Sequence, residues 1–307
     1  MKTSLNTYCV QVFKYMKNFS IYPSVTIGIL TKNSEETIGD CLASIINCDY
    51  EKSKMEIIVV DGGSRDRTLN IVKIYQRKAR QMGIKFKVLK ERKGLGYARQ
   101  LVVENAQGEY LCWIDSDNIV PHSLLKMQIS FIRNKSSIGI VIPLVMPIGK
   151  NLIQRIQGYI WLIPTLNAIK TKRTPYLTMM GTLCPLKVLK KIGGFNVDIK
   201  GAGEDVDLIS KLKHNGYRVA VNPRAIIYHH MRKTIHAFLK HIVWYGRTSP
   251  KSSTKVLIKD GIFRILLYIK LIPLMIKIFK DPASILTPFF ITVWSIIHMI
   301  TNLCKES

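Results

Sequence analysis

The sequence is poor in acidic residues and shows no leader at its start. It has 20 Asp and Glu against 46 Lys and Arg in 307 residues, a formal net charge of +26. Such an excess predicts attraction to polyanions, whether anionic lipid, nucleic acid or nucleotide phosphates, and charge alone does not choose among them. Residues 1–19 lack the apolar run and cleavage site of a signal peptide. We expect residues 1–23 to form an amphipathic segment, either interfacial or a docking helix.

Two further absences narrow the class of protein. The six cysteines show no C-x-x-C spacing and no histidines at zinc-finger distances, which predicts free thiols in a reducing compartment. The glycines of residues 93–98, KGLGYA, do not follow the first predicted strand, and no G-x-x-x-x-G-K-[ST] is present. Neither a dinucleotide oxidoreductase nor a nucleotidyltransferase is therefore expected.

Strand and helix patterns alternate from Ser24 onward. Apolar strand-like runs end at residues 30, 61, 90 and 115, and helical periodicity or a Gly-containing turn separates them. Successive strand–helix units predict an α/β fold with a mostly parallel, Rossmann-like sheet flanked by helices. Weaker signals between residues 138 and 185 indicate a segment that shapes a pocket. We expect this domain to span residues 24–247.

The composition changes after residue 230. Residues 231–280 contain one acidic residue, Asp260, and residues 284–303 contain no charged residue. An uncharged apolar run of about 20 residues is long enough to span a membrane. We therefore expect residues 248–307 to form a basic linker and a hydrophobic helical hairpin over 262–303, turning at Asp281–Pro282. The alternative is a hydrophobic docking subdomain or an oligomer contact.

Acidic side chains follow two of the predicted strands. Asp115 and Asp117 end one strand at positions i and i+2, where two carboxylates can converge on Mg²⁺ or Mn²⁺, although solvated turns share this pattern. Asp61 follows another buried strand at the same sheet edge and can accept hydrogen bonds from a nucleobase or ribose, or can cap a turn. His229 and His230 end a later strand, as ligands of the same metal or as ordinary polar residues.

Two further pairs of charged residues are candidates for binding or catalysis. Lys93 and Arg99 flank glycines and can offset phosphate charge, or can be surface cations. Glu204 and Asp205 follow flexible glycines at a predicted helix start. A carboxylate there can act as a general base if burial raises its pKa, or can merely complement the helix dipole.

Taken together, these segments resemble the family 2 glycosyltransferases, inverting enzymes with the GT-A fold. The similarity covers roughly residues 24–247 and keeps the family's order and spacing. The matching segments are VTIGILTKN at 25–33, IIVVDGGSRDRT at 57–68, WIDSDN at 113–118 (the family's DxD), GGFNVDIKGAGEDVDLISKLKHNGYRV at 193–219, and the stretch from 221 to the Tyr-Gly-Arg ending at 247. The tail resembles members that carry C-terminal membrane helices.

The resemblance implies a donor side. Thr31, Asn33 and Asp61 are then expected to contact the nucleotide. Asp115 is expected to approach the ribose or the metal, and Asp117 to be the principal metal ligand.

The resemblance also implies an acceptor side. Asp205 is expected to deprotonate the acceptor and Glu204 to help hold it, while His229 or His230 approaches the metal or the diphosphate. The chain lacks the QxxRW motif of processive members, which argues against polymer synthesis.

The sequence thus predicts an inverting, metal-dependent hexosyltransferase. We expect a UDP- or GDP-sugar donor, a hydroxyl or phosphate acceptor that is lipid-linked, and a place at the cytoplasmic face of the cell membrane; nucleic acid is not an expected partner. The alternative is a non-catalytic, basic membrane- or nucleic-acid-binding protein built on the same fold, which leaves the acids at the strand ends unexplained.

Overall fold

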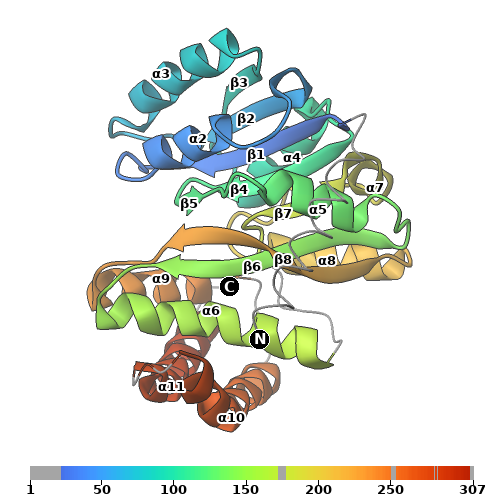
Figure 1. Ribbon diagram of the computed structural model, residues 1–307. Helices are drawn as coiled ribbons and strands as arrows, with labels where there is room; N and C mark the ends of the chain where they lie inside the picture. The colour runs from blue at the N-terminus through green and yellow to red at the C-terminus, as the bar shows by residue number, and fades with distance from the viewer. Residues whose placement is uncertain (1–21, 172–177, 250–253, 280, 282, 305–307) are drawn as a thin grey trace, which may run out of the picture.

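The computed structural model describes residues 22–171, 178–249, 254–279, 281 and 283–304 (Figure 1). The predicted amphipathic segment lies almost wholly outside these residues. The strands are β1 Val25–Thr31, β2 Met55–Asp61, β3 Lys85–Lys90, β4 Tyr110–Asp115, β5 Asn118–Ile119, β6 Ile138–Ile148, β7 Thr182–Pro185 and β8 Arg218–His230. The helices are α2 Ile38–Ile46, α3 Thr68–Gln81, α4 Leu95–Asn105, α5 Leu124–Ile132, α6 Leu152–Thr171, α7 Leu186–Lys191, α8 Glu204–His214, α9 Ile235–Thr248, α10 Thr254–Phe279 and α11 Ala283–Leu303, with a 3₁₀ turn at Lys52–Lys54.

The N-terminal half of the sheet is parallel, as the alternating pattern predicts. The strands of the described sheet follow the order β3-β2-β1-β4-β7-β6-β8-β5, and β1 pairs in parallel with both β2 and β4. The register places Thr31 opposite Asp61 and Leu30 opposite Asp115. The carboxyl ends of three neighbouring strands therefore meet at one edge, where ligands bind in open α/β sheets.

The C-terminal half makes the sheet mixed. β7 is antiparallel to β4 and β6, whereas β8 runs parallel to β6. The two-residue β5 pairs antiparallel with the end of β8 and sets Asn118 opposite His229. This pairing brings the turn after β4 against a strand that lies more than 100 residues later in the chain.

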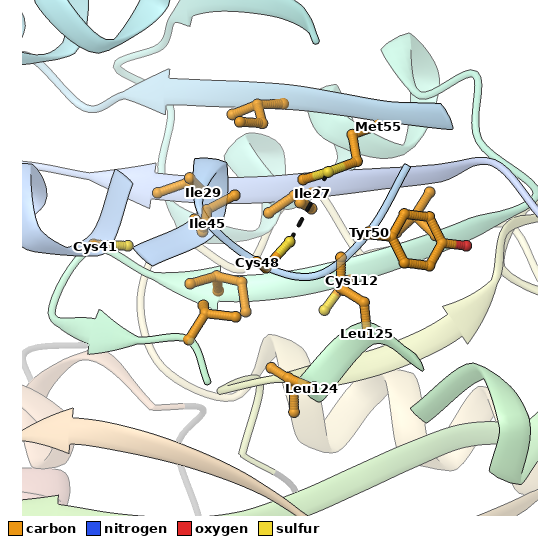
Figure 2. Close-up of a cluster of buried hydrophobic side chains, with 14 of the residues drawn as sticks. Ile27, Ile29, Cys41, Ile45, Cys48, Tyr50, Met55, Cys112, Leu124 and Leu125 are labelled. Atoms are coloured by element: carbon orange, nitrogen blue, oxygen red, sulfur yellow. Dashed lines mark hydrogen bonds between the residues drawn. The ribbon is translucent and has the colours of Figure 1, made fainter. Parts of the chain in front are cut away.

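Two hydrophobic layers hold the sheet between helices. One face packs on α2, α3 and α5, and Figure 2 shows part of this layer, with Ile27 of β1, Ile45 of α2 and Leu125 of α5. The Cys48 thiol there lies 3.9 Å from the Met55 sulfur (Figure 2). The other face packs on α4, α7 and α8. Burying each such aliphatic side chain stabilises the fold by roughly 1.5–3 kcal/mol, so the sheet edge is a rigid base for a site.

The C-terminal region forms the predicted helical hairpin. α10 begins at Thr254, eight residues before the expected start, and Asp281 lies in the turn before α11. The hairpin packs on α6 and α9 at the end of the molecule farthest from α3 (Figure 1), around a third hydrophobic cluster that includes Phe238, Tyr268 and Trp294. Among the described residues, one helix, Ser284–Leu303, is long and apolar enough to cross a membrane.

The five cysteines that the structure describes are free, as the spacing predicts. Four are buried in the sheet layers, and Cys304 is exposed.

Candidate active site

One large cavity lies between the sheet edge, the start of α8 and the helices α9–α11. Its volume is about 1180 Å³, and its lining includes carboxylates, cations and aromatic rings. Single small-molecule sites generally measure about 300–1,000 Å³. The cavity is therefore large enough for two reactants side by side. Six of the residues singled out in the sequence line it: Arg99, Asp115, Asp117, Glu204, Asp205 and His229.

Asp117 and His229 form a close pair at the sheet edge. His229 Nδ1 lies 3.2 Å from Asp117 Oδ1 and 3.0 Å from Asn118 Nδ2. Burial alone would raise the pKa of Asp117, but the charge of His229, its hydrogen bond and the charge of Arg232 hold that pKa below its ordinary value. Burial would lower the pKa of His229, and Asp117 reverses this and raises it. Asp117 is therefore an ionised carboxylate held in place by an imidazole.

Arg99 is a buried bridge between the two acidic motifs. It is 5% exposed, its Nη2 lies 3.7 Å from Asp115 Oδ1, and its Nε lies 3.5 Å from Glu204 Oε1. Its guanidinium also covers the Trp113 ring at 4.8 Å. Burial raises the pKa of Asp115 and raises that of Glu204 to about 7, against the opposing charge of Arg99 in both cases. This position excludes the interpretation of Arg99 as a surface cation.

Asp205 occupies the first turn of α8. The helix begins at Glu204 after Gly203, whose φ of 114° is accessible chiefly to glycine. Asp205 Oδ1 accepts a hydrogen bond from the Val206 N–H at 2.8 Å. Burial raises the pKa of Asp205, and the nearby helix N–H groups and Arg99 oppose this rise. The side chain is less enclosed than Glu204 and lines the cavity.

The residues expected to contact the nucleotide lie just outside the cavity lining. The Asp61 carboxylate accepts hydrogen bonds from the Gly63 and Ser64 N–H groups and from Ser64 Oγ, so it organises its own turn. Asn33, at φ 50°, accepts a hydrogen bond from the Arg65 N–H and ties the first two strand-end loops together. Thr31 is buried and its Oγ1 has no hydrogen-bond partner in the described part of the chain.

Two predicted residues point to other surroundings. The Lys93 ammonium lies 4.5 Å from the centre of the Tyr97 ring, and Lys93 is not among the residues that line the cavity. His230 donates its backbone N–H to the Asp117 carbonyl, and its Nε2 is buried without a hydrogen-bond partner among the described residues. Of the two histidines, His229 is the one whose ring reaches Asp117.

Several lining residues were not singled out in the sequence. Arg232 follows His229 by three positions, and its charge acts on Asp117, while burial lowers its own pKa. His241, one helix turn before Tyr245, lies 4.6 Å from that ring, and burial lowers the pKa of His241 to about 3, so its imidazole is neutral. The His-x-x-Arg spacing was the signal that could have revealed Arg232.

An aromatic wall completes the cavity. It consists of Trp161 of α6, Trp244 and Tyr245 of α9, and Trp294 of α11. Neighbouring ring centres lie 5.2–6.3 Å apart along the series Trp244, Tyr245, Trp294 and Trp161. These residues come from three helices that are far apart in the sequence, so no local pattern joins them.

The donor set of the site suits a hard divalent cation. Asp115 and Asp117 both line the cavity, and the contact of Asp117 with His229 is made through Oδ1; an ionised carboxylate has two oxygens with about four lone pairs for ligands. No group of three or more His, Cys, Asp or Glu side chains within the described ranges is arranged to hold a metal ion without further ligands. Diphosphate oxygens of a bound nucleotide would complete such a site, as Mg²⁺ sites commonly require.

The mostly parallel sheet between two layers of helices has the architecture of the GT-A fold. The chain belongs to glycosyl transferase family 2, whose model matches residues 26–192. A second model, glycosyl transferase family group 2, matches residues 110–304 and so includes both C-terminal helices.

Curated relatives are distant in sequence. A Methanococcus voltae enzyme, dolichyl N-acetyl-α-D-glucosaminyl phosphate 3-β-D-2,3-diacetamido-2,3-dideoxy-β-D-glucuronosyltransferase, is 25% identical over 79% of this chain and 76% of its own length. The Staphylococcus aureus poly-β-1,6-N-acetyl-D-glucosamine synthase is 28% identical over 88% of this chain, which spans 64% of the synthase.

Solved structures share the fold. The Pyrobaculum calidifontis mannosyltransferase PcManGT, in complex with GDP-Man and Mn²⁺, superposes with a TM-score of 0.66 at 17% identity, over 94% of this chain and 89% of that one. The S. aureus TarS fragment in complex with UDP-GlcNAc superposes with a TM-score of 0.52 at 22% identity, over 80% of this chain and 66% of that one.

Proposed function

We propose that the protein transfers a sugar from a UDP- or GDP-sugar to a lipid-linked acceptor, with inversion at the anomeric carbon and with a divalent cation at the acidic turn. The observation that carries this proposal is the convergence of Asp115, Asp117 and His229 from the sheet edge with Glu204 and Asp205 from α8 on one cavity. A family 2 member needs donor-side and acceptor-side carboxylates within reach of each other, and this cavity contains both.

The donor is proposed to lie along the carboxyl edge of β2, β1 and β4. The unpartnered Thr31 Oγ1 at this edge is a hydrogen-bonding group that a nucleoside could satisfy. Asn33 and Asp61 hold the adjoining loops at the carboxyl edge of the sheet, where ligands bind in open α/β folds. Solved structures with the same fold contain GDP-Man or UDP-GlcNAc, which supports both nucleotide classes.

The chemistry follows from the two acidic groups. A divalent cation bound at Asp115 and Asp117 would neutralise the charge that develops on the diphosphate leaving group. Asp205 accepts the proton of the acceptor hydroxyl while its oxygen attacks the anomeric carbon from the face opposite the diphosphate. A new C–O bond forms, the C–O bond to the phosphate breaks, and the nucleoside diphosphate leaves with the bonding electrons. This single displacement inverts the configuration.

Asp205 is the better base of the two neighbouring acids. Burial raises the pKa of both acids, but Asp205 is less enclosed than Glu204 and lines the cavity, and its Oδ1 accepts the Val206 N–H, so its carboxylate is the one better placed to reach an acceptor hydroxyl. Glu204 faces Arg99 and is more deeply buried, which fits a role in holding the acceptor-side loop and the acceptor.

The proposal of a lipid-linked acceptor and of a membrane location is supported by the C-terminal helices. α10 and α11 expose large apolar side chains, and one of these helices has the length of a span. Lys and Arg far outnumber Asp and Glu in residues 231–280, as in segments that face the cytoplasm or anionic lipid. The Methanococcus voltae relative is named for an acceptor carried on dolichyl phosphate. The proposed location is the cytoplasmic face of the membrane.

Calorimetric titration with a panel of UDP- and GDP-sugars, in Mn²⁺ or in EDTA, tests the proposal. We expect Mn²⁺-dependent binding of one donor that Asp117→Ala abolishes, whereas Asp205→Asn keeps donor binding and loses transfer to a lipid extract. Asp40→Asn, which changes an exposed acid on α2, serves as the control. Binding of no donor, or near-normal transfer by Asp205→Asn, would overturn the proposal.

A further inference from the structure

The loop of residues 196–203 leads directly into the acidic start of α8, and α4 holds it from one side. The Gly96 N–H donates to the Ile199 carbonyl at 2.9 Å, and a Cβ atom on Gly96 would clash with the Asn196 carbonyl oxygen. The two backbones therefore touch with no side chain between them. This contact fixes the first part of the loop, whereas its last residues depend on a different support.

That second support is Thr248, the final residue of α9. The Ala202 N–H donates to Thr248 Oγ1 at 3.1 Å, and the same hydroxyl donates to the Trp244 carbonyl at 2.8 Å. A Cβ atom on Gly201 would clash with the Thr248 Cβ, so the close approach requires glycine at position 201. Ala202 is 4% exposed, so removal of the hydroxyl would take from its N–H a hydrogen bond that water does not readily replace.

Helix α11 in turn holds the end of α9. Asn302 is fully buried, and its Nδ2 donates to the Gly246 carbonyl at 3.3 Å and to Ser249 Oγ at 3.1 Å. A Cβ atom on Gly246 would clash with Thr301 Oγ1, so α9 and α11 also touch closely here. Hydrogen bonds from α11 thus reach the chain on both sides of Thr248.

We infer that Thr248 is a positioning residue for Asp205, and that α11 keeps Thr248 in place through Asn302. The inference rests on the proposed function and adds to it the support that holds the base. Two residues separate Ala202 from Asp205, so a displacement of Ala202 moves the first turn of α8. An error of about 1 Å in the position of a reacting group can lower a rate by about 100-fold.

This arrangement gives α11 a role inside the protein as well as outside it. The helix is long and apolar enough to cross a membrane, and its buried Asn302 supports the loop that carries the acids. Arg99 holds Glu204 from the side of α4, so loss of the Thr248 contact should displace the acids without releasing α8. The rate of transfer should then depend on how α11 packs on α9, whereas donor binding at the sheet edge should not.

Hydrogen exchange of the full-length protein in detergent measures the contact without turnover. Thr248→Val keeps the shape of the side chain and removes the hydroxyl. We expect peptides covering residues 196–208 to exchange roughly two- to tenfold faster, as loss of one hydrogen bond predicts, and Thr248→Ser to exchange like the parent protein. Thr171→Val is the matched control, because Thr171 ends α6 and donates to the Asn167 carbonyl at 2.8 Å in the same way. It should leave the exchange of the loop unchanged.

The effect on catalysis is measured with UDP-GlcNAc and GDP-mannose as donors and a total membrane-lipid extract as the source of acceptor. Thr248→Val and Asn302→Leu should each lower kcat about tenfold or more while the donor Kd changes by less than about twofold, and Thr248→Ser should restore kcat. The double variant should lose little more than either single variant, because both substitutions act through one contact. Unchanged loop exchange in Thr248→Val, an equal loss in Thr171→Val, or multiplied losses in the double variant would overturn the inference.

The Asp205→Asn variant separates this inference from the proposed function. Near-normal transfer by Asp205→Asn, or binding of no donor by the parent protein, contradicts the proposed function, and the loop exchange of Thr248→Val still tests the contact. Loss of transfer in Asp205→Asn together with a parental kcat in Thr248→Val supports the proposed function and contradicts the positioning role of Thr248.

Discussion

Replacing Arg99 by Met removes the cation that lies between the buried carboxylate of Glu204 and the half-buried carboxylate of Asp115. Its Nη2 and Nε atoms lie 3.7 Å from Asp115 and 3.5 Å from Glu204, and Arg99 and Glu204 are 5% and 4% exposed. Breaking a buried ion pair by removal of one partner costs about 3–5 kcal/mol, because the remaining charge is left without compensation. The contact with Trp113 at 4.8 Å adds a smaller loss. At about pH 8, we expect Arg99→Met to lower the free energy of unfolding by roughly 3–5 kcal/mol.

The loss should depend on pH in a defined direction. Burial already raises the pKa of Glu204 from 4.5 to about 7, and without Arg99 it would rise further. A carboxyl whose pKa is higher in the folded protein than in the unfolded chain binds a proton on folding, so its destabilising effect develops as pH rises above the unfolded value. The effect of Arg99→Met should therefore shrink to about half or less near pH 5, where Glu204 is protonated in the folded state.

Denaturant unfolding of the protein in detergent measures both effects. Arg77→Met, which removes an exposed cation from α3, is the matched control and should cost less than about 0.5 kcal/mol at either pH. Arg99→Lys keeps the charge and should recover part of the stability. Equal losses in Arg99→Met and Arg77→Met, or a loss that does not change with pH, would refute the bridge between the two acidic motifs.

Two further predictions concern Glu204 and the hairpin. The shift of the Glu204 pKa from 4.5 to about 7 corresponds to roughly 3 kcal/mol. The free energy of unfolding of Glu204→Gln, relative to that of the parent protein, should therefore rise by up to this amount between about pH 5 and pH 9. Unfolding midpoints measured across this pH range check the prediction, and a difference that does not change with pH contradicts it. Leu266→Glu with Phe289→Glu, at 60% and 65% exposed positions of α10 and α11, should shift the protein from liposomes to the soluble fraction in flotation, whereas Ile74→Glu on α3 should not. Retention of the double variant on liposomes would contradict contact of this face with lipid.

The parallel half of the fold was predictable because its signals are local. Each strand from β1 to β4 is an apolar run followed by a turn and a helix, so the order of the elements and the shared carboxyl edge follow from the pattern. The antiparallel half depends on pairs far apart in the chain, such as Asn118 with His229. No short-range periodicity specifies such a pair, so the mostly parallel sheet is confirmed while its antiparallel pairings were not predicted.

The candidate site likewise combines residues with a local sequence signal and contacts that only tertiary packing creates. Asp115, Asp117, Glu204 and Asp205 belong to compact motifs, and the structure brings all four to one cavity. The function of each side chain within a motif depended on tertiary packing. Asp61, for example, was interpreted as a nucleotide contact or a cap, and its carboxylate caps its own turn, which leaves the nucleotide role as a proposal.

The aromatic wall could not be predicted from the sequence. Trp161, Tyr245 and Trp294 lie on three helices, and each is an ordinary apolar residue in its own helix. Their contact arises because α6, α9 and α11 pack around the third hydrophobic cluster.

The position of Arg99 explains how one fold keeps two acidic groups ready for different tasks. Asp115 and Glu204 come from the end of β4 and the start of α8, and each lies within 4 Å of the same guanidinium. Without that cation, burial and mutual repulsion would drive protons onto these acids and loosen the loop before α8. With it, the carboxylate of Asp115, on the proposed donor side, is held near the start of α8, on the proposed acceptor side. Such preorganised charges need little rearrangement when the leaving group develops its charge, which is where electrostatic stabilisation is most effective.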